Sequence, residues 1–166
     1  MNIGEGISGA LFSDENRRFR YALWRIWQPD GDKLLFIGLN PSTANDVKDD
    51  PTIRRLIRFA KSWGFGGLFA GNLFSLVTAD PAVLWFSSSK EEVNGPNDIA
   101  LKQMSGLSRK VMVGWGNQGI YAGTRPEEVL ALIGQPVFCI KRTKEGQPFH
   151  PLYMPLSSQL VPYVRE

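Results

Sequence analysis

The sequence predicts an α/β domain of three layers, in which a central four-stranded parallel sheet is covered by helices on both faces. Four short apolar runs are separated by segments that have the periodicity of helices. The runs do not alternate with polar residues, which is typical of strands that are buried on both faces. They begin at Leu34, Leu68, Val111 and Val137.

An N-terminal β-hairpin is predicted as an extension of this sheet. One strand is expected over residues 19–27 and a second over residues 33–39. Between them lies the segment Pro-Asp-Gly-Asp, residues 29–32, whose turn chemistry favours a tight connection between neighbouring strands.

Helices are predicted over residues 50–64, 95–107 and 124–133. The first of them has Asp50 as its N-cap and Pro51 in its first turn, which is the usual order at a helix start. Apolar residues recur along it at helical spacing, so we expect one of its faces to pack on the sheet.

The composition is that of a globular protein, and it predicts a single domain over residues 1–166. Hydrophobic residues make up 43% of the chain and charged residues 21%. The formal net charge of +3 is compatible with a phosphate-bearing partner. No run approaches the roughly 20 apolar residues that span a bilayer, and no basic-then-apolar leader is present. We therefore expect a cytoplasmic protein without membrane contacts.

Cysteine and histidine usage limits the possible chemistry. Cys139 is the single cysteine and lies in an apolar run, so an internal disulfide and a cysteine-cluster metal site are excluded. His150 is the single histidine, which also argues against an ordinary zinc site. We expect neither a metal nor a cofactor.

Polar residues gather where the predicted strands end. Asn40 follows the first apolar run, Asn72 lies near the end of the second, and His150 comes after the fourth. Ligands of parallel sheets bind beyond the carboxyl ends of the strands, so these three residues are candidates for one binding edge. Each also has a structural interpretation: Asn-Pro favours a turn, a buried amide can serve internal hydrogen bonding, and a loop histidine is usually exposed.

Several short motifs resemble those of the uracil-DNA glycosylase superfamily, especially its mismatch-specific branch. Phe-Ile-Gly-Leu-Asn-Pro (residues 36–41) is similar to its first motif, and the segment around Asn72 to its base-reading segment. Residues 111–116 resemble its Trp-Gly turn, and His150-Pro151 its terminal motif. Leu-Asn-Pro-Ser-Thr-Ala and His-Pro-Leu-Tyr more closely resemble signatures of an uncharacterised bacterial and phage domain family, over about residues 34–153.

The resemblance implies a uracil-DNA-glycosylase-like fold and distinct roles for individual residues. Asn40 would orient a water molecule at the anomeric carbon, and Asn72 would pair with a base edge through its donor and acceptor. His150 would donate a hydrogen bond to the departing base. Phe74 or Trp115 would stack on that base.

Further ligand contacts are expected from the loop after the first apolar run and from the helix that follows it. The loop contacts implied by the resemblance are those of Gly38, Leu39, Pro41 and Ser42. In the helix, Arg55 is a candidate for a phosphate contact, because a planar guanidinium binds phosphate well.

Three functions remain open from the sequence. The first is hydrolysis of an N-glycosidic bond in nucleic acid or in a free nucleotide. The second is a protein that binds and sequesters a nucleotide-derived signal without turnover, and the third is a scaffold with a vestigial pocket. Leu152 stands where the superfamily has a serine, and Met154 and Leu156 are the candidates for a DNA-opening wedge, which favours the second function weakly. Asn40, Asn72 and His150 argue against the third, and hydrolysis of an N-glycosidic bond is the function we expect. The sequence also leaves association with further copies of the chain open.

Overall fold

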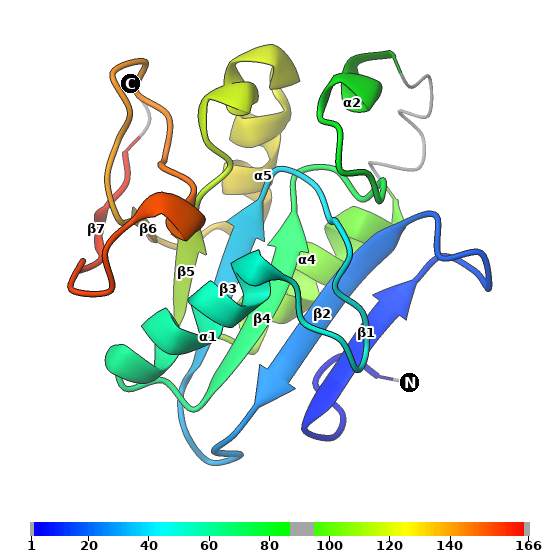
Figure 1. Ribbon diagram of the computed structural model, residues 1–166, viewed down its shortest axis with the longest axis vertical. Helices are drawn as coiled ribbons and strands as arrows, with labels where there is room; N and C mark the ends of the chain where they lie inside the picture. Colours follow the sequence, from blue (N-terminus) through cyan, green and yellow to red (C-terminus); the bar gives the residue numbers. More distant parts are fainter. Residues whose placement is uncertain (1, 87–94, 165–166) are drawn as a thin grey trace.

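The chain forms a seven-stranded mixed sheet with helices packed against both faces (Figure 1). The computed structural model describes residues 2–86 and 95–164. Neighbouring strands follow the order β1-β2-β4-β3-β5-β6-β7. Their bounds are β1 Ser8–Phe12, β2 Arg20–Ile26, β3 Lys33–Gly38, β4 Gly67–Asn72, β5 Lys110–Val113, β6 Val137–Cys139 and β7 Val161–Pro162.

The helices include one on one face of the sheet and a pair on the other. They are α1 Pro51–Ser62, α2 Ala82–Phe86, α4 Pro96–Gly106 and α5 Arg125–Ile133, with 3-10 turns η1 Asn117–Ala122 and η2 Pro151–Tyr153. The predicted start of α1 is confirmed: Asp50 is the N-cap and accepts a 2.8 Å hydrogen bond from the backbone N–H of Ile53.

The predicted fold class, a central four-stranded parallel sheet, is wrong. Strand pairs β4–β3, β3–β5 and β5–β6 are parallel, but β1–β2, β2–β4 and β6–β7 are antiparallel and belong to the same sheet. Strands β1 and β7 are not among the predicted strands. Strand β7 is only two residues long, which gives too short a pattern to predict a strand. Strand β1 belongs to the sheet only through its pairing with β2, and such pairing is not visible in the local sequence.

The predicted N-terminal hairpin is also wrong, since β2 and β3 lie on opposite sides of β4. The turn-rich segment between them wraps around the start of β4. The backbone N–H groups of Trp27 and Gln28 both donate to the carbonyl of Gly66, and the N–H of Gly66 donates to the carbonyl of Asp32. A Cβ on Gly31 would lie 2.9 Å from the Cα of Gly66, so glycine permits this close crossing.

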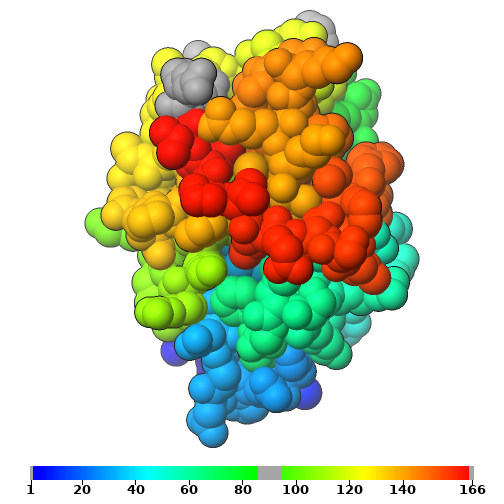
Figure 2. Space-filling model, turned by 90° about the vertical axis from the view of Figure 1, so that its left-hand side faces the viewer, coloured from blue at the N-terminus to red at the C-terminus, as the bar shows by residue number. Residues whose placement is uncertain are grey.

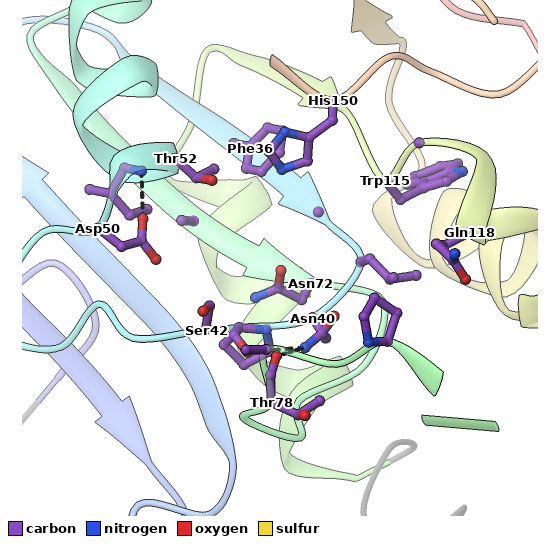
Figure 3. A pocket seen from close by; sticks show the side chains of 18 of the residues that line it. Phe36, Asn40, Ser42, Asp50, Thr52, Asn72, Thr78, Trp115, Gln118 and His150 are labelled. Atoms are coloured by element: carbon purple, nitrogen blue, oxygen red, sulfur yellow. Dashed lines mark hydrogen bonds between the residues drawn. The ribbon is translucent and has the colours of Figure 1, made fainter. Parts of the chain in front are cut away.

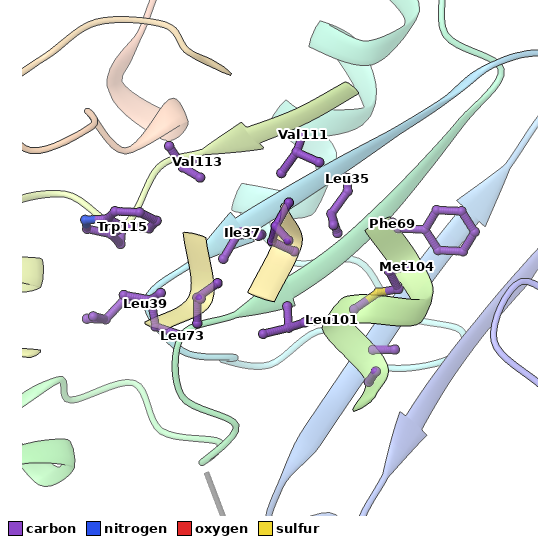
Figure 4. Packing of buried hydrophobic residues seen from close by; sticks show 14 of the residues in the cluster. Leu35, Ile37, Leu39, Phe69, Leu73, Leu101, Met104, Val111, Val113 and Trp115 are labelled. Atoms are coloured by element: carbon purple, nitrogen blue, oxygen red, sulfur yellow. The ribbon is translucent and has the colours of Figure 1, made fainter. Parts of the chain in front are cut away.

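The core has two parts, one on each face of the sheet, as the unbroken apolar run of β3 predicts. On one face, Leu35 and Ile37 pack with Leu101 and Met104 of α4 (Figure 4). The opposite face of β3 packs against α1, with Phe36 among the residues of that second cluster. The helices on both faces therefore fix the direction of each β3 side chain.

The C-terminal segment lies along α1, where Figure 2 shows the orange and red end of the chain beside the cyan-green helix. The indole N–H of Trp63 donates to the carbonyl of Ser158 at 3.0 Å. Arg55 donates to the carbonyl of Met154. These bonds anchor the segment that begins at His150.

Candidate functional site

A cavity of about 370 Å³ opens at the carboxyl ends of β3, β4 and β5, on the α1 side of the sheet (Figure 3). In Figure 3, Asp50 and Thr52 at the start of α1 lie opposite Trp115 and Gln118, with Asn40 and Asn72 between them. The lining residues include the predicted loop contacts and several others: Arg20, Phe36, Gly38, Leu39, Asn40, Pro41, Ser42, Asp50, Thr52, Ile53, Ala70, Gly71, Asn72, Thr78, Ala79, Pro81, Trp115, Gly116, Asn117, Gln118, His150 and Tyr153.

The floor of the cavity depends on the pairing of β3 with β4. Gly38 and Asn72 are partners in the parallel register. A Cβ on Gly38 would lie 3.0 Å from Oδ1 of Asn72 and 3.0 Å from Cε1 of Phe36. Glycine at this position therefore lets a carboxamide and an aromatic ring lie together in the floor.

Asn72 lines the cavity, and its side-chain amide has no hydrogen-bond partner among the described residues. The residue is 5% exposed. Its backbone carbonyl accepts a 3.1 Å hydrogen bond from Nδ2 of Asn97, whereas its side chain makes no hydrogen bond to any residue in 2–86 or 95–164. Because buried amides are normally hydrogen-bonded, this side chain is suited to a ligand with a complementary donor and acceptor.

Asn40 lines the same cavity but uses its amino group within the protein. Nδ2 lies 2.7 Å from the carbonyl of Thr78, 3.0 Å from that of Pro41 and 3.5 Å from that of Leu76. Three carbonyl acceptors around one atom identify it as the nitrogen of the amide. Asn40 thus ties the loop after β3 to the loop after β4, and only its oxygen is available to a ligand.

His150 enters the cavity in a defined tautomer. It is the N-cap of η2, and its Nδ1 accepts a 3.2 Å hydrogen bond from the backbone N–H of Leu152. Burial lowers the pKa of His150, while the carboxylate of Asp50 acts in the opposite direction. The neutral ring therefore carries its proton on Nε2, which is a hydrogen-bond donor.

Of the two predicted stacking residues, Trp115 lines the cavity and Phe74 does not. Trp115 is 2% exposed, and its indole N–H donates to Oε1 of Gln147 at 2.9 Å. Phe74 packs edge-on against Trp85, with ring centroids 5.7 Å apart. Phe36, which begins the segment similar to the first glycosylase motif but is not among the expected ligand contacts, is a further aromatic residue in the lining.

Arg55 does not line the cavity, and the predicted phosphate contact finds no support in its position. Its guanidinium donates to the carbonyl of Met154 and lies over the ring of Phe59, 5.5 Å from the centroid. It therefore lies between α1 and the C-terminal segment.

Two charged residues of the cavity were missed by sequence reasoning. Asp50 is 8% exposed and uses one oxygen as the N-cap acceptor, while the second has no hydrogen-bond partner in the described part of the chain. Arg20, at the start of β2, is 4% exposed. The local sequence identifies Asp50 only as a helix cap, and nothing in the sequence around Arg20 indicates that it faces a cavity.

Within residues 2–86 and 95–164 there is no cluster of three or more histidine, cysteine, aspartate or glutamate side chains that could hold a metal ion. The same part of the chain contains no helix of the length and apolarity needed to cross a bilayer.

By its fold and site, the protein is an α/β domain with a mixed sheet, helices on both faces and a ligand-sized cavity at one edge of the sheet. A family model described as "Protein of unknown function (DUF1643)" matches residues 20–152, and the chain belongs to this family. No curated protein and no solved structure matches the chain. The resemblance to uracil-DNA glycosylases stays a prediction.

Proposed function

We propose that the cavity binds a nucleobase and that the protein hydrolyses the N-glycosidic bond of a base-bearing ligand, in nucleic acid or in a free nucleotide. The observation that carries this proposal is the side chain of Asn72, a buried amide that lines the cavity without a partner in the described residues. A nucleobase edge presents adjacent donors and acceptors, which one carboxamide can match.

The surroundings of Asn72 support a flat heterocycle as the ligand. The ring of Phe36 lies beside the amide at Gly38, so a base could pair with Asn72 while contacting an aromatic surface. A volume of about 370 Å³ falls within the range of roughly 300–1,000 Å³ that is common for small-molecule sites.

Two groups in the lining could assist cleavage. As the bond between C1′ and the base nitrogen breaks, its electron pair moves to the base, and Nε2–H of His150 would stabilise the resulting negative charge. Water supplies the oxygen that bonds to C1′, and its proton would pass to the carboxylate of Asp50. That carboxylate would also stabilise positive charge on the sugar in the transition state.

The role expected of Asn40 changes in this account. Its amino group is bound to backbone carbonyls, so it would contribute at most its carbonyl oxygen to orienting water. Asp50 is the stronger candidate for that task because a carboxylate accepts a proton far more readily than an amide does.

Sequestration without turnover is the second candidate. The observation that favours it is that the side-chain amino group of Asn40 is already hydrogen-bonded to the backbone carbonyls of Pro41 and Thr78. A cavity whose first-motif asparagine braces two loops could hold a nucleotide without cleaving it.

For either function we propose the cytoplasm as the compartment, in keeping with the single buried thiol of Cys139.

Turnover and binding can be separated in one experiment. Base release from uracil-containing, mismatched and modified DNA and from free nucleotides is followed by mass spectrometry, alongside calorimetric binding. Asp50→Asn and His150→Asn are suitable variants, since asparagine can still accept the capping hydrogen bond in each case. We expect each to slow release by orders of magnitude with little change in affinity. If ligands bind but are all recovered intact, hydrolysis is contradicted and sequestration becomes the function that the result supports. If no nucleobase binds, both functions are contradicted.

A further inference from the structure

Two buried arginines on β2 have contrasting surroundings. Arg25, 8% exposed, forms an ion pair with Asp49 at 2.8 Å and donates to the carbonyls of Trp24 and Asn45 at 2.8 and 2.5 Å. The side chain of Arg20, a residue that is 4% exposed, donates only to the carbonyl of Ala44, at 3.0 Å, among the hydrogen bonds of the described residues. Its Nε is buried and has no hydrogen-bond partner there.

Arg20 is therefore an incompletely paired charge inside the protein. It makes no ion pair with a carboxylate of residues 2–86 or 95–164. Burial lowers its pKa to about 10, with Asp50 raising it and Arg25 lowering it. Buried charges are costly unless they are paired, and Arg20 lines the cavity. A ligand group that enters the cavity could supply the missing partner.

Uncommitted donors occur in the same lining. The hydroxyls of Ser42 and Thr52 make no hydrogen bonds to described residues. Thr52 is also the first residue of α1 with a backbone N–H, because Pro51 has none, and no residue of the described chain accepts from it. The N-terminus of a helix attracts anions, and α1 starts at this wall of the cavity.

We infer that Arg20, Ser42 and Thr52 form an anion subsite that binds a phosphate oxyanion of the ligand. The identification of that anion as phosphate rests on the proposed function, since nucleotides carry it. Arg20 supplies a planar set of donors suited to phosphate oxygens. Asp50 is the opposing charge in this wall, so a singly charged oxyanion is favoured over a doubly charged one.

The oxyanion could belong to a free nucleotide or to a nucleic-acid strand. Because Arg20 is 4% exposed, the phosphate must enter the cavity to reach it. Both sources present the same chemistry, and they are distinguished by comparing a nucleoside monophosphate with a short single-stranded oligonucleotide that lacks terminal phosphates.

The test compares wild-type protein with Arg20→Met and Arg20→Lys. Methionine keeps an unbranched apolar stem without charge, and lysine keeps the charge without the planar fork. Calorimetry measures affinities for nucleosides, the corresponding monophosphates and the oligonucleotide. Thermal melting with and without inorganic phosphate provides a readout that does not depend on the base.

We expect the wild-type protein to bind a phosphate-bearing ligand at least about tenfold more tightly than its nucleoside. Arg20→Met should remove this preference without changing nucleoside affinity, and Arg20→Lys should reduce it. Inorganic phosphate should raise the melting temperature of the wild type but not that of Arg20→Met. If only the monophosphate binds more tightly than the nucleoside, the natural source of the phosphate is a free nucleotide. If the oligonucleotide also binds more tightly, the source is a nucleic-acid strand. Either result supports the subsite.

Arg25→Met is the matched control for a paired arginine. It should lower the melting temperature, whereas Arg20→Met should leave it unchanged or raise it. An Arg20→Met chain that fails to fold would overturn the inference by identifying Arg20 as a structural brace, as would equal affinity of the wild type for nucleosides and phosphates. If no base binds but phosphate still stabilises the wild type through Arg20, the proposed function fails and the anion subsite stands.

Discussion

Asn40 and Asn72 lie in the same cavity at the ends of adjacent parallel strands, yet their carboxamides do different things. Asn40 donates to the carbonyls of Pro41 and Thr78 and so joins two loops. The side chain of Asn72 makes no hydrogen bond within the described chain. The comparison indicates that one asparagine holds the cavity in shape while the other is available to what enters it.

The difference arises from where each residue stands relative to the sheet. Asn72 is the last residue of β4 and faces Gly38 across the register, where a side chain on the partner would fill the space. Asn40 lies two residues beyond β3, in a loop where the backbone carbonyls of Pro41 and Thr78 lie within hydrogen-bonding distance of its amide nitrogen. A carboxamide in that loop is drawn into backbone hydrogen bonding.

The largest effect is expected from Asn40→Asp, compared with Asn72→Asp. The aspartate at position 40 would place carboxylate oxygens against backbone carbonyls that now accept from the amide. We expect the free energy of unfolding to fall by at least about 3 kcal/mol, and by about 1–3 kcal/mol for Asn40→Ala. Chemical denaturation measures both. A larger loss for Asn72→Asp than for Asn40→Asp would reverse the comparison.

Asn72→Ala should separate binding from stability. Because its amide has no internal partner, unfolding free energy should change by less than about 1 kcal/mol, while nucleobase affinity falls roughly 5- to 150-fold. Calorimetry and thermal melting on the same sample measure the two quantities. A protein that unfolds while the folded fraction keeps its affinity would show that Asn72 is structural.

Gly38→Ala tests the packing beneath Asn72. The added methyl would lie 3.0 Å from Oδ1 of Asn72, so the amide must shift by a few tenths of an ångström. We expect affinity for the nucleobase to fall by about tenfold, with a smaller effect on stability. Gly106→Ala is the control, since a Cβ there meets no atom within 4 Å and should leave binding unchanged.

The smallest effect concerns pH and His150. Its folded-state pKa is lowered, so the unfolded chain takes up the proton first, at the ordinary histidine pKa of about 6.5. The stability associated with the neutral ring is thus fully present above about pH 6.5 and declines as the pH falls below it. His150→Asn keeps a capping acceptor but cannot titrate, so its stability should fall less between pH 7 and 5.5. Equal pH profiles by chemical denaturation would contradict this.

The sequence predicts the features that depend on local signals. The four apolar runs, the Asp50 cap of α1 and the position of Asn72 at a strand end are all readable from neighbouring residues. Strand pairing is a long-range property, so the same turn chemistry at residues 29–32 suggested a hairpin where the chain in fact crosses β4.

The missed members of the site have the same physical origin. Phe36 reads as one more apolar residue of a buried strand, and Asp50 as a helix cap. Arg20 reaches the cavity only because β2 pairs with β4, which no local pattern reveals. Conversely, the amino group of Asn40 is occupied by carbonyls from a segment almost forty residues away.

The central claim, that Asn72 and not Asn40 presents its amide to a nucleobase, is tested most directly by the side-chain amide resonances of the ¹⁵N-labelled protein. In the free protein, the Nδ2 hydrogens of Asn40 should exchange slowly with solvent and those of Asn72 rapidly. On titration with nucleosides carrying each of the common bases, at least one should shift the Asn72 resonances strongly and leave the hydrogen-bonded Asn40 pair nearly unmoved. Binding that perturbs Asn40 while leaving Asn72 unchanged, or no binding by any nucleoside, would contradict the account.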